Sequence, residues 1–124
     1  EQALNTYDQA ILLIRKGRLN EALSALNTFV QVNDDSDDTP LAYFCMGEIN
    51  LTNGNLAVAT QNYNTLVGLY PTHWKVPLAK FKLGTIYLEQ GNDVRATAQF
   101  ENVIKEFPES SAAKASAETL SSLE

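Results

Sequence analysis

The chain has 124 residues, a formal net charge of −6 from 15 acidic and 9 basic side chains, and an apolar fraction of 44%. This length and composition are typical of one globular domain. The acidic balance argues against nucleic acid or anionic lipid as a partner, and no apolar run approaches the roughly 20 residues that span a bilayer. A single Cys and a single His exclude an internal disulfide and a His/Cys metal cluster.

The first third of the chain predicts two helices, over residues 2–16 and 19–33, with a turn at Gly17 between them. An acidic segment, residues 34–38, follows the second helix. It lies just before a helix expected to begin near Pro40, where the helix dipole favours negative charge. We therefore predict a solvated connector in which an Asp caps the next helix.

A calcium-binding loop is the alternative interpretation of the acidic segment. An EF-hand loop needs Gly at its sixth position and Glu at its twelfth. No register that starts at Asn33, Asp34 or Asp35 supplies both. The sequence therefore predicts no metal site.

The middle of the chain predicts helices over residues 40–53 and 56–70, and Pro71 ends the second because proline cannot continue the hydrogen-bond ladder. The connector that follows contains His73 and Trp74. No motif supplies the His with a Ser, Cys or Asp partner, so we predict no catalytic role for it. Two interpretations of the Trp stay open: it closes over the core, or it projects as a binding anchor.

The last third predicts helices over residues 76–90 and 93–107. Gly91 suits a left-handed helix C-cap, and Asn92 or Asp93 can cap the next helix. The residues after Pro108 predict a seventh, amphipathic helix over 111–123, which covers the apolar end of the last pair.

A 37-residue period connects these helix pairs. Small and large apolar residues, turn glycines and prolines recur at this spacing, as Gly17/Gly54/Gly91, Ala22/Ala59/Ala96, Leu26/Tyr63/Phe100 and Pro71/Pro108. The period predicts an all-α fold of three helical hairpins plus a C-terminal capping helix. We expect one domain over residues 1–124, with repeats at about 3–36, 40–73 and 77–110.

The third repeat carries Leu83-Gly84-x-x-Tyr87, then Ala96-x-x-x-Phe100, then Pro108. This order resembles the tetratricopeptide (TPR) pattern. The resemblance implies a TPR-type α-solenoid, in which a small residue lets two helices approach closely and an aromatic ring fills the remaining space.

A narrower resemblance rests on three segments: Tyr7-Asp8-Gln9-Ala10, Tyr70-Pro71-Thr72-His73-Trp74-Lys75 and Phe107-Pro108-Glu109-Ser110. They are similar to the C-terminal TPR domain of the Tol-Pal system protein YbgF family, also named cell division coordinator CpoB. The resemblance implies a periplasmic protein that binds TolA and the peptidoglycan synthesis machinery. Such proteins coordinate outer-membrane constriction with septal peptidoglycan synthesis in cell division.

The same resemblance implies features outside the sequence given. The chain opens without Met or an apolar leader, so we expect a mature protein or an excised domain. Full-length members carry a signal peptide and an N-terminal coiled coil that trimerises, whereas this fragment is expected to be a monomer. Direct membrane insertion is not expected.

The candidate binding surface is the concave face, lined in this architecture by the first helix of each pair. The aromatic residue three positions before each small residue, and the apolar residue seven positions later, are expected to point toward it. The predicted peptide-binding residues are Tyr7, Ile11, Ile14, Leu41, Phe44, Glu48, Leu51, Leu78, Phe81 and Leu88.

Two interpretations of this strip stay open. Its side chains either pack between neighbouring helices or form an exposed apolar surface that binds a peptide or helix. TPR adaptors that hold a C-terminal carboxylate need Lys and Asn on this face, and the aromatic residues Tyr7, Phe44 and Phe81 argue against that subtype.

No phosphate loop, nucleophile elbow or acid/base pair is present, so we predict neither an enzyme nor a cofactor. Cys45 has no basic neighbour in sequence that would activate its thiol, and a structural role is expected. The leading functional hypothesis is a protein-protein interaction module of the bacterial envelope. The alternative is a scaffold subunit of another envelope TPR complex, such as an outer-membrane assembly lipoprotein.

Overall fold

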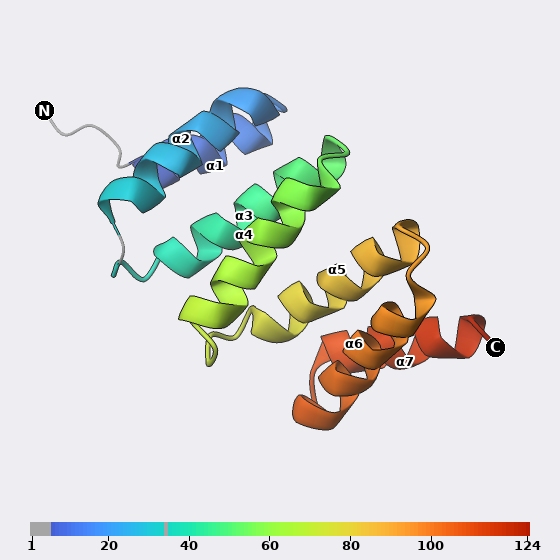
Figure 1. Cartoon of the computed structure of the whole chain (residues 1–124). Coiled ribbons are helices and arrows are strands. Elements are labelled where there is room, and N and C mark those ends of the chain that lie inside the picture. The colour runs from blue at the N-terminus through green and yellow to red at the C-terminus, as the bar shows by residue number, and fades with distance from the viewer. Residues whose placement is uncertain (1–5, 34) are drawn as a thin grey trace, which may run out of the picture. The chain divides into compact units, whose positions relative to one another are not determined.

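The computed structural model describes residues 6–33 and 35–124. These ranges contain seven α-helices and no strand. The helices are α1 (Thr6–Arg15), α2 (Leu19–Val32), α3 (Thr39–Thr52), α4 (Leu56–Leu69), α5 (Val76–Glu89), α6 (Asp93–Glu106) and α7 (Ser111–Ser122). The prediction of an all-α fold with three hairpins and a terminal helix is confirmed (Figure 1).

The predicted helix bounds agree with the observed ones to within a residue or two, apart from the first helix. Its predicted start at residue 2 lies outside the described residues. None of the helices in the described ranges is long and apolar enough to cross a membrane.

The chain divides into two compact units, and the division falls inside α4, between Asn62 and Tyr63. Unit 1 contains α1, α2, α3 and the first part of α4. Unit 2 contains the rest of α4 with α5, α6 and α7. The single domain over residues 1–124 stays a prediction.

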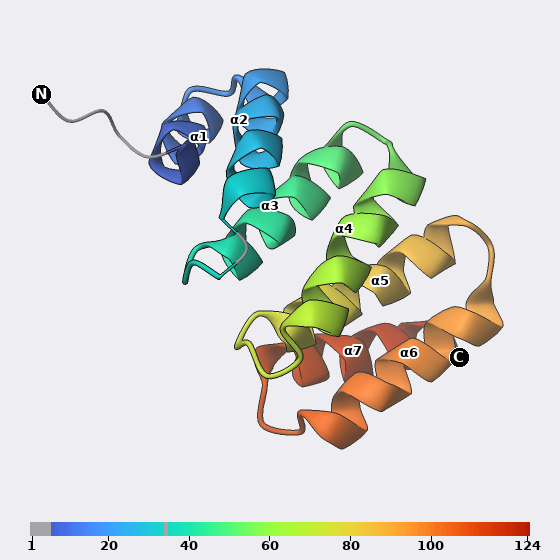
Figure 2. The ribbon, with the colours of Figure 1, turned by 60° about the vertical axis from the view of Figure 1, so that its left-hand side comes forward.

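In unit 1, α1 and α2 form a hairpin, and α2 also packs against α3 (Figures 1 and 2). The core of this unit gathers small and large apolar side chains from all three helices: Ala10, Ala22, Leu26, Phe29, Ala42, Met46 and Ile49. One polar pair is buried beside them. The Asn50 amide donates a 2.8 Å hydrogen bond to Asn62 Oδ1, which joins α3 to the start of α4 and satisfies both groups away from water.

In unit 2, α5 packs against α6, and α7 contacts both helices. At Gly84, α5 lies close to the Phe100 side chain of α6. A Cβ atom at that position would lie 2.5 Å from the Phe100 ring, inside van der Waals contact. The small residue therefore makes room for the aromatic ring between the paired helices, as the TPR resemblance implied. Val103 of α6 packs with Ala112 and Ala113 of α7, so the terminal helix covers apolar surface of the last pair.

The three hairpin turns share one hydrogen-bond pattern. Gly17, Gly54 and Gly91 adopt φ values of 77°, 81° and 77°, a left-handed conformation that costs glycine little. At the last turn, the Gly91 amide donates to Leu88 O and the Asn92 amide donates to Tyr87 O. This is a Schellman motif. The Asn92 side chain then caps α6 by accepting from the Arg95 amide at 3.2 Å, as predicted.

The prediction that an Asp caps α3 is wrong for the residue at the N-cap. Asp38 occupies that position, but its side chain makes no capping hydrogen bond. The Ser36 hydroxyl accepts a 3.1 Å hydrogen bond from the Asp38 amide, in a turn that precedes the helix. The Thr39 hydroxyl also donates to the Asn33 carbonyl and closes the connector. Asp34 lies outside the described residues.

Candidate functional site

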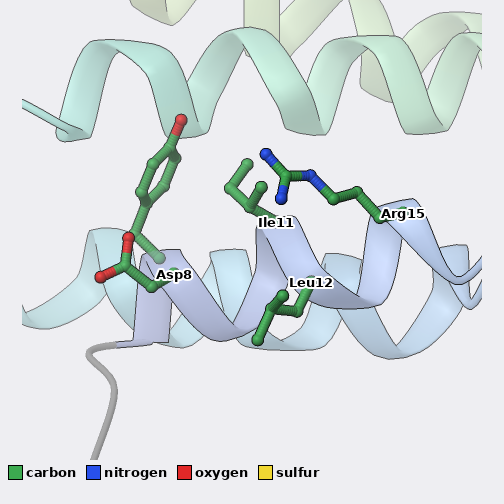
Figure 3. A pocket seen from close by; sticks show the side chains of 5 residues that line it. Asp8, Ile11, Leu12 and Arg15 are labelled. Carbon is green, nitrogen blue, oxygen red and sulfur yellow. The ribbon is translucent and has the colours of Figure 1, made fainter.

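An open hollow of about 440 Å³ lies against α1 in unit 1. Its lining residues are Tyr7, Asp8, Ile11, Leu12 and Arg15, and we call it the α1 hollow. Figure 3 shows Ile11 and Arg15 on the side of α1 that faces α3, with Leu12 directed the other way. Leu12 is 41% exposed, so part of this apolar lining meets solvent.

Helical spacing explains which side chains reach the hollow. Tyr7, Ile11 and Arg15 are four residues apart and share one face of α1. Ala10, by contrast, is fully buried in the core of the α1–α2 hairpin. The position of each residue along α1 therefore determines whether its side chain faces the core or the hollow.

Tyr7 contributes to both environments. Its ring packs against Phe29, with ring centroids 5.7 Å apart. Burial, together with the smaller effects of the nearby Cys45, Asp38 and Asp8, raises the pKa of Tyr7 to about 12. The hydroxyl is therefore neutral at physiological pH and can donate a hydrogen bond to a ligand or to α3.

The predicted residues of α3 are less accessible than expected. Phe44 is only 6% exposed, which agrees with the packing interpretation that the sequence left open, and its role in peptide binding stays a prediction. Residues on nearly every side of α3 are buried, and a helix that is apolar all round lies inside a protein. Leu41, Glu48 and Leu51 remain partly exposed.

The predicted residues of α5 belong to unit 2 and are all partly exposed: Leu78, Phe81 and Leu88. Phe81 packs against Phe100 of α6, with ring centroids 5.6 Å apart, and also against the Val103 cluster. Its ring therefore has a structural role as well as some exposed surface. Ile14 of α1, in unit 1, likewise packs partly against its unit's core.

His73 has a structural role that sequence reasoning missed. Its Nδ1 accepts a hydrogen bond from the Lys75 amide at 3.1 Å, which orders the connector before α5. Burial and the neighbouring Lys75 lower the pKa of His73, so the neutral form that accepts this bond is favoured. In the described part of the chain, no group of three His, Cys, Asp or Glu side chains lies close enough to hold a metal ion.

Two family models described as tetratricopeptide repeats match the sequence, one over residues 7–73 and the other over residues 78–110. The chain belongs to the tetratricopeptide repeat family. Comparison with curated protein sequences finds no significant match.

Solved structures of similar fold accord with this TPR assignment. A crystal structure of MamA has a TM-score of 0.70 and 22% identity over 83% of this chain. The first TPR of Spaghetti (RPAP3), bound to the HSP90 peptide SRMEEVD, has a TM-score of 0.75 and 15% identity, and the match covers 95% of this chain and 89% of that one. The Arabidopsis OM64 TPR domain has a TM-score of 0.76 and 15% identity, with coverages of 96% and 93%.

This TPR chain spans 57% of the MamA chain and 53% of the chain in a second MamA crystal structure. At these identities the likeness shows a shared fold. The residues of the α1 hollow were only partly predicted from the sequence. Asp8, Leu12 and Arg15 were missed, although Arg15 follows Ile11 by four residues, a spacing that places both on one helical face.

Proposed function

We propose that this TPR chain is a non-enzymatic binding module that holds a segment of another protein against the first helix of its repeats. The observation that carries this proposal is the α1 hollow, where partly exposed apolar side chains lie between two charged ones. Exposed apolar surface rimmed by polar groups is typical of interaction sites when it is large, and this hollow has the same arrangement on a small scale. Membership of a family of interaction modules supports the same conclusion.

The composition of the α1 hollow favours an amphipathic segment. Ile11 and Leu12 offer apolar surface, while Asp8 and Arg15 stand seven residues apart along the helix. A partner helix with an apolar stripe and charges of both signs at its edges matches this arrangement. Phe44 is too deeply buried to act as a central anchor without rearrangement.

Selection from a displayed library of random peptides against the full chain tests the binding site. Selected amphipathic peptides with charges of both signs should bind Ile11→Ser at least tenfold more weakly, since an apolar contact in the hollow is lost. Val58→Ser is the matched control, because Val58 is 43% exposed and lies outside the hollow. Equal loss in both variants, or no selected peptide, would refute the site.

The finer proposal follows from the resemblance of the inter-repeat segments. We infer a periplasmic module that binds TolA and, with the peptidoglycan synthesis machinery, coordinates outer-membrane constriction with septal wall synthesis during cell division. The segments Tyr7-Asp8-Gln9-Ala10 and Tyr70–Lys75 support this inference. Trimerisation of the full-length protein, through a coiled coil that precedes this sequence, and a monomeric TPR fragment belong to the same proposal.

Titration calorimetry with the long helical middle region of TolA tests the finer proposal. Binding by the wild type and its loss in Ile11→Ser are expected. If the wild type binds library peptides but not this TolA region, the TolA proposal fails and the binding module stands. A scaffold role in another envelope complex would then be the next hypothesis.

A further inference from the structure

Trp74 is the most exposed aromatic side chain in the described part of unit 2. It lies in the connector before α5, and 70% of its surface is accessible. Of the two interpretations left open by the sequence, projection is the one observed. Exposure of a large indole is costly in water, and Trp is enriched at binding hot spots.

Contacts within the connector restrain this exposed ring. His73 and Trp74 are stacked, with ring centroids 5.5 Å apart and an interplanar angle of 26°. The backbone beneath them is tied by hydrogen bonds from the His73 amide to Tyr70 O and from the Val76 amide to His73 O, each 3.0 Å long. A ring that is already ordered loses little conformational entropy when a partner covers it.

A hollow of about 230 Å³ lies beside the indole. We call it the Trp74 hollow. Its lining residues come from the starts of α5 and α7: Trp74, Lys75, Pro77, Leu78, Ser110, Ser111 and Ala112. Pockets that enclose small molecules are usually about 300–1,000 Å³. This hollow therefore suits one inserted side chain rather than a metabolite.

The charged side chain that lines the Trp74 hollow is basic, although the chain as a whole carries −6. Lys75 is the one charged residue in the lining, and its Nζ lies 5.0 Å from the centre of the indole ring. Neither α5 nor α7 has an acidic residue in its first turn, so the positive ends of both helix dipoles add to this potential. Glu109 is exposed next to Ser110 but does not line the hollow.

We propose that the Trp74 hollow docks an internal acidic segment of a partner protein, which inserts one large apolar side chain flanked by Asp or Glu. The apolar side chain packs on the indole and Leu78, and the flanking carboxylates face Lys75. This surface is distinct from the α1 hollow, and the inference goes beyond the proposed function by naming the chemistry of a second partner contact.

Arrays of synthetic 12-residue peptides provide the test. In each peptide a central Phe or Leu is flanked by Asp or Glu, and matched arrays carry Lys or Ser flanks. Acetylated and amidated ends exclude recognition of a terminal carboxylate. Trp74 is the single Trp of the chain, so its fluorescence reports directly on insertion. We expect acidic peptides to shift the emission to shorter wavelength and to bind more weakly as salt increases.

Variants of the full chain assign the contacts. Trp74→Ala should weaken binding of the acidic peptides at least tenfold, measured by calorimetry because the fluorophore is removed. Lys75→Gln should weaken it about threefold and reduce its dependence on salt, as expected for a rim charge. The matched controls are Val94→Ala, an 85% exposed apolar residue, and Lys105→Gln, an exposed Lys, both on α6 and outside the hollow. Both should bind like the wild type.

Three outcomes of the peptide experiments would overturn the proposal. These are the absence of any acidic peptide that binds with a dissociation constant below 1 mM, equal binding of acidic and Lys-flanked peptides, and unchanged binding by Trp74→Ala. An emission shift with protein concentration alone would also overturn it, because a second copy of the chain would then cover the indole. Ile11→Ser should bind the acidic peptides normally, so failure here is distinguishable from failure at the α1 hollow.

Discussion

The α1–α2 hairpin of unit 1 and the α5–α6 hairpin of unit 2 pack their paired helices together with different residues. At equivalent positions of the 37-residue repeat, unit 1 has Ala10 and Leu26, and unit 2 has Gly84 and Phe100. All four are buried. In unit 2 the first helix has Gly where unit 1 has Ala, and the second helix has the larger Phe where unit 1 has Leu. The repeat therefore specifies a combined volume at this contact rather than particular residues.

The connectors show the same principle for polar groups. Ser36 and His73 are also 37 residues apart. Each accepts a 3.1 Å hydrogen bond from the amide two residues later, Asp38 in one case and Lys75 in the other. The residue between the acceptor and the donor of this bond differs: it is Asp37 in unit 1 and Trp74 in unit 2. A shared backbone thus presents an acidic surface in one unit and an aromatic, basic one in the other.

Truncation of the large residue in each small–large helix contact, Phe100 or Leu26, should have the largest effect on stability. Phe100→Ala is expected to lower the free energy of unfolding by about 3–5 kcal/mol, and Leu26→Ala by about 2–5 kcal/mol. Both side chains are fully buried, so each change leaves a cavity. Chemical denaturation followed by circular dichroism measures the loss. An unchanged denaturation midpoint for either variant would show that the paired positions are misassigned.

The compensation between a smaller residue on one helix and a larger residue on its partner can be tested directly. Gly84→Ala should cost about 1–3 kcal/mol by overpacking, because its Cβ would meet the Phe100 ring at 2.5 Å. This exceeds the roughly 0.5–1 kcal/mol that Ala gains over Gly within a helix. The double variant Gly84→Ala/Phe100→Leu reproduces the Ala and Leu pair of unit 1. Its loss of stability should be smaller than the sum of the losses in the two single variants. Strict additivity would contradict the compensation between the two positions.

The hairpin turns should respond alike in the two units. Gly17→Ala and Gly91→Ala place a side chain at the same φ of 77°, where nothing lies within 4 Å of the added Cβ. The cost is therefore conformational, about 1–2 kcal/mol in each case. Gly91→Asn is the control and should lose less, since Asn tolerates this conformation better. A large difference between the two Ala variants in thermal melts would argue against equivalent turns.

The smallest expected effect is a pH dependence confined to the His73 connector. Because the pKa of His73 is lowered in the folded state, stability from its neutral form is present above the unfolded value of about 6.5. It is lost as the pH falls through the lower folded value. His73→Ser, which installs the residue found at the equivalent connector position of unit 1, should lose less stability than the wild type between about pH 7.5 and pH 5. Equal pH slopes in denaturation experiments would exclude His73 as the cause.

The elements were predictable because their signals are local and repeated. Turn glycines, proline stops and an Asn cap act within a few residues of their own position, and the 37-residue period supplied independent copies of most of them. The helices predicted over 56–70 and 93–107 are therefore observed as Leu56–Leu69 and Asp93–Glu106. The predicted capping Asp at the start of α3 was wrong: Asp38 lies at the N-cap, but its side chain makes no capping hydrogen bond, and that orientation is not encoded by the residue type alone.

The candidate sites were only partly predictable. From the sequence came the helices, their repeat positions and the face on which Tyr7 and Ile11 lie, all of which follow from helical periodicity. The tertiary structure decided that Phe44 is buried at 6% exposure, that Trp74 projects at 70%, and that Arg15 joins the α1 hollow. Exposure depends on which other helices cover a face, and those neighbours are brought together only when the chain folds.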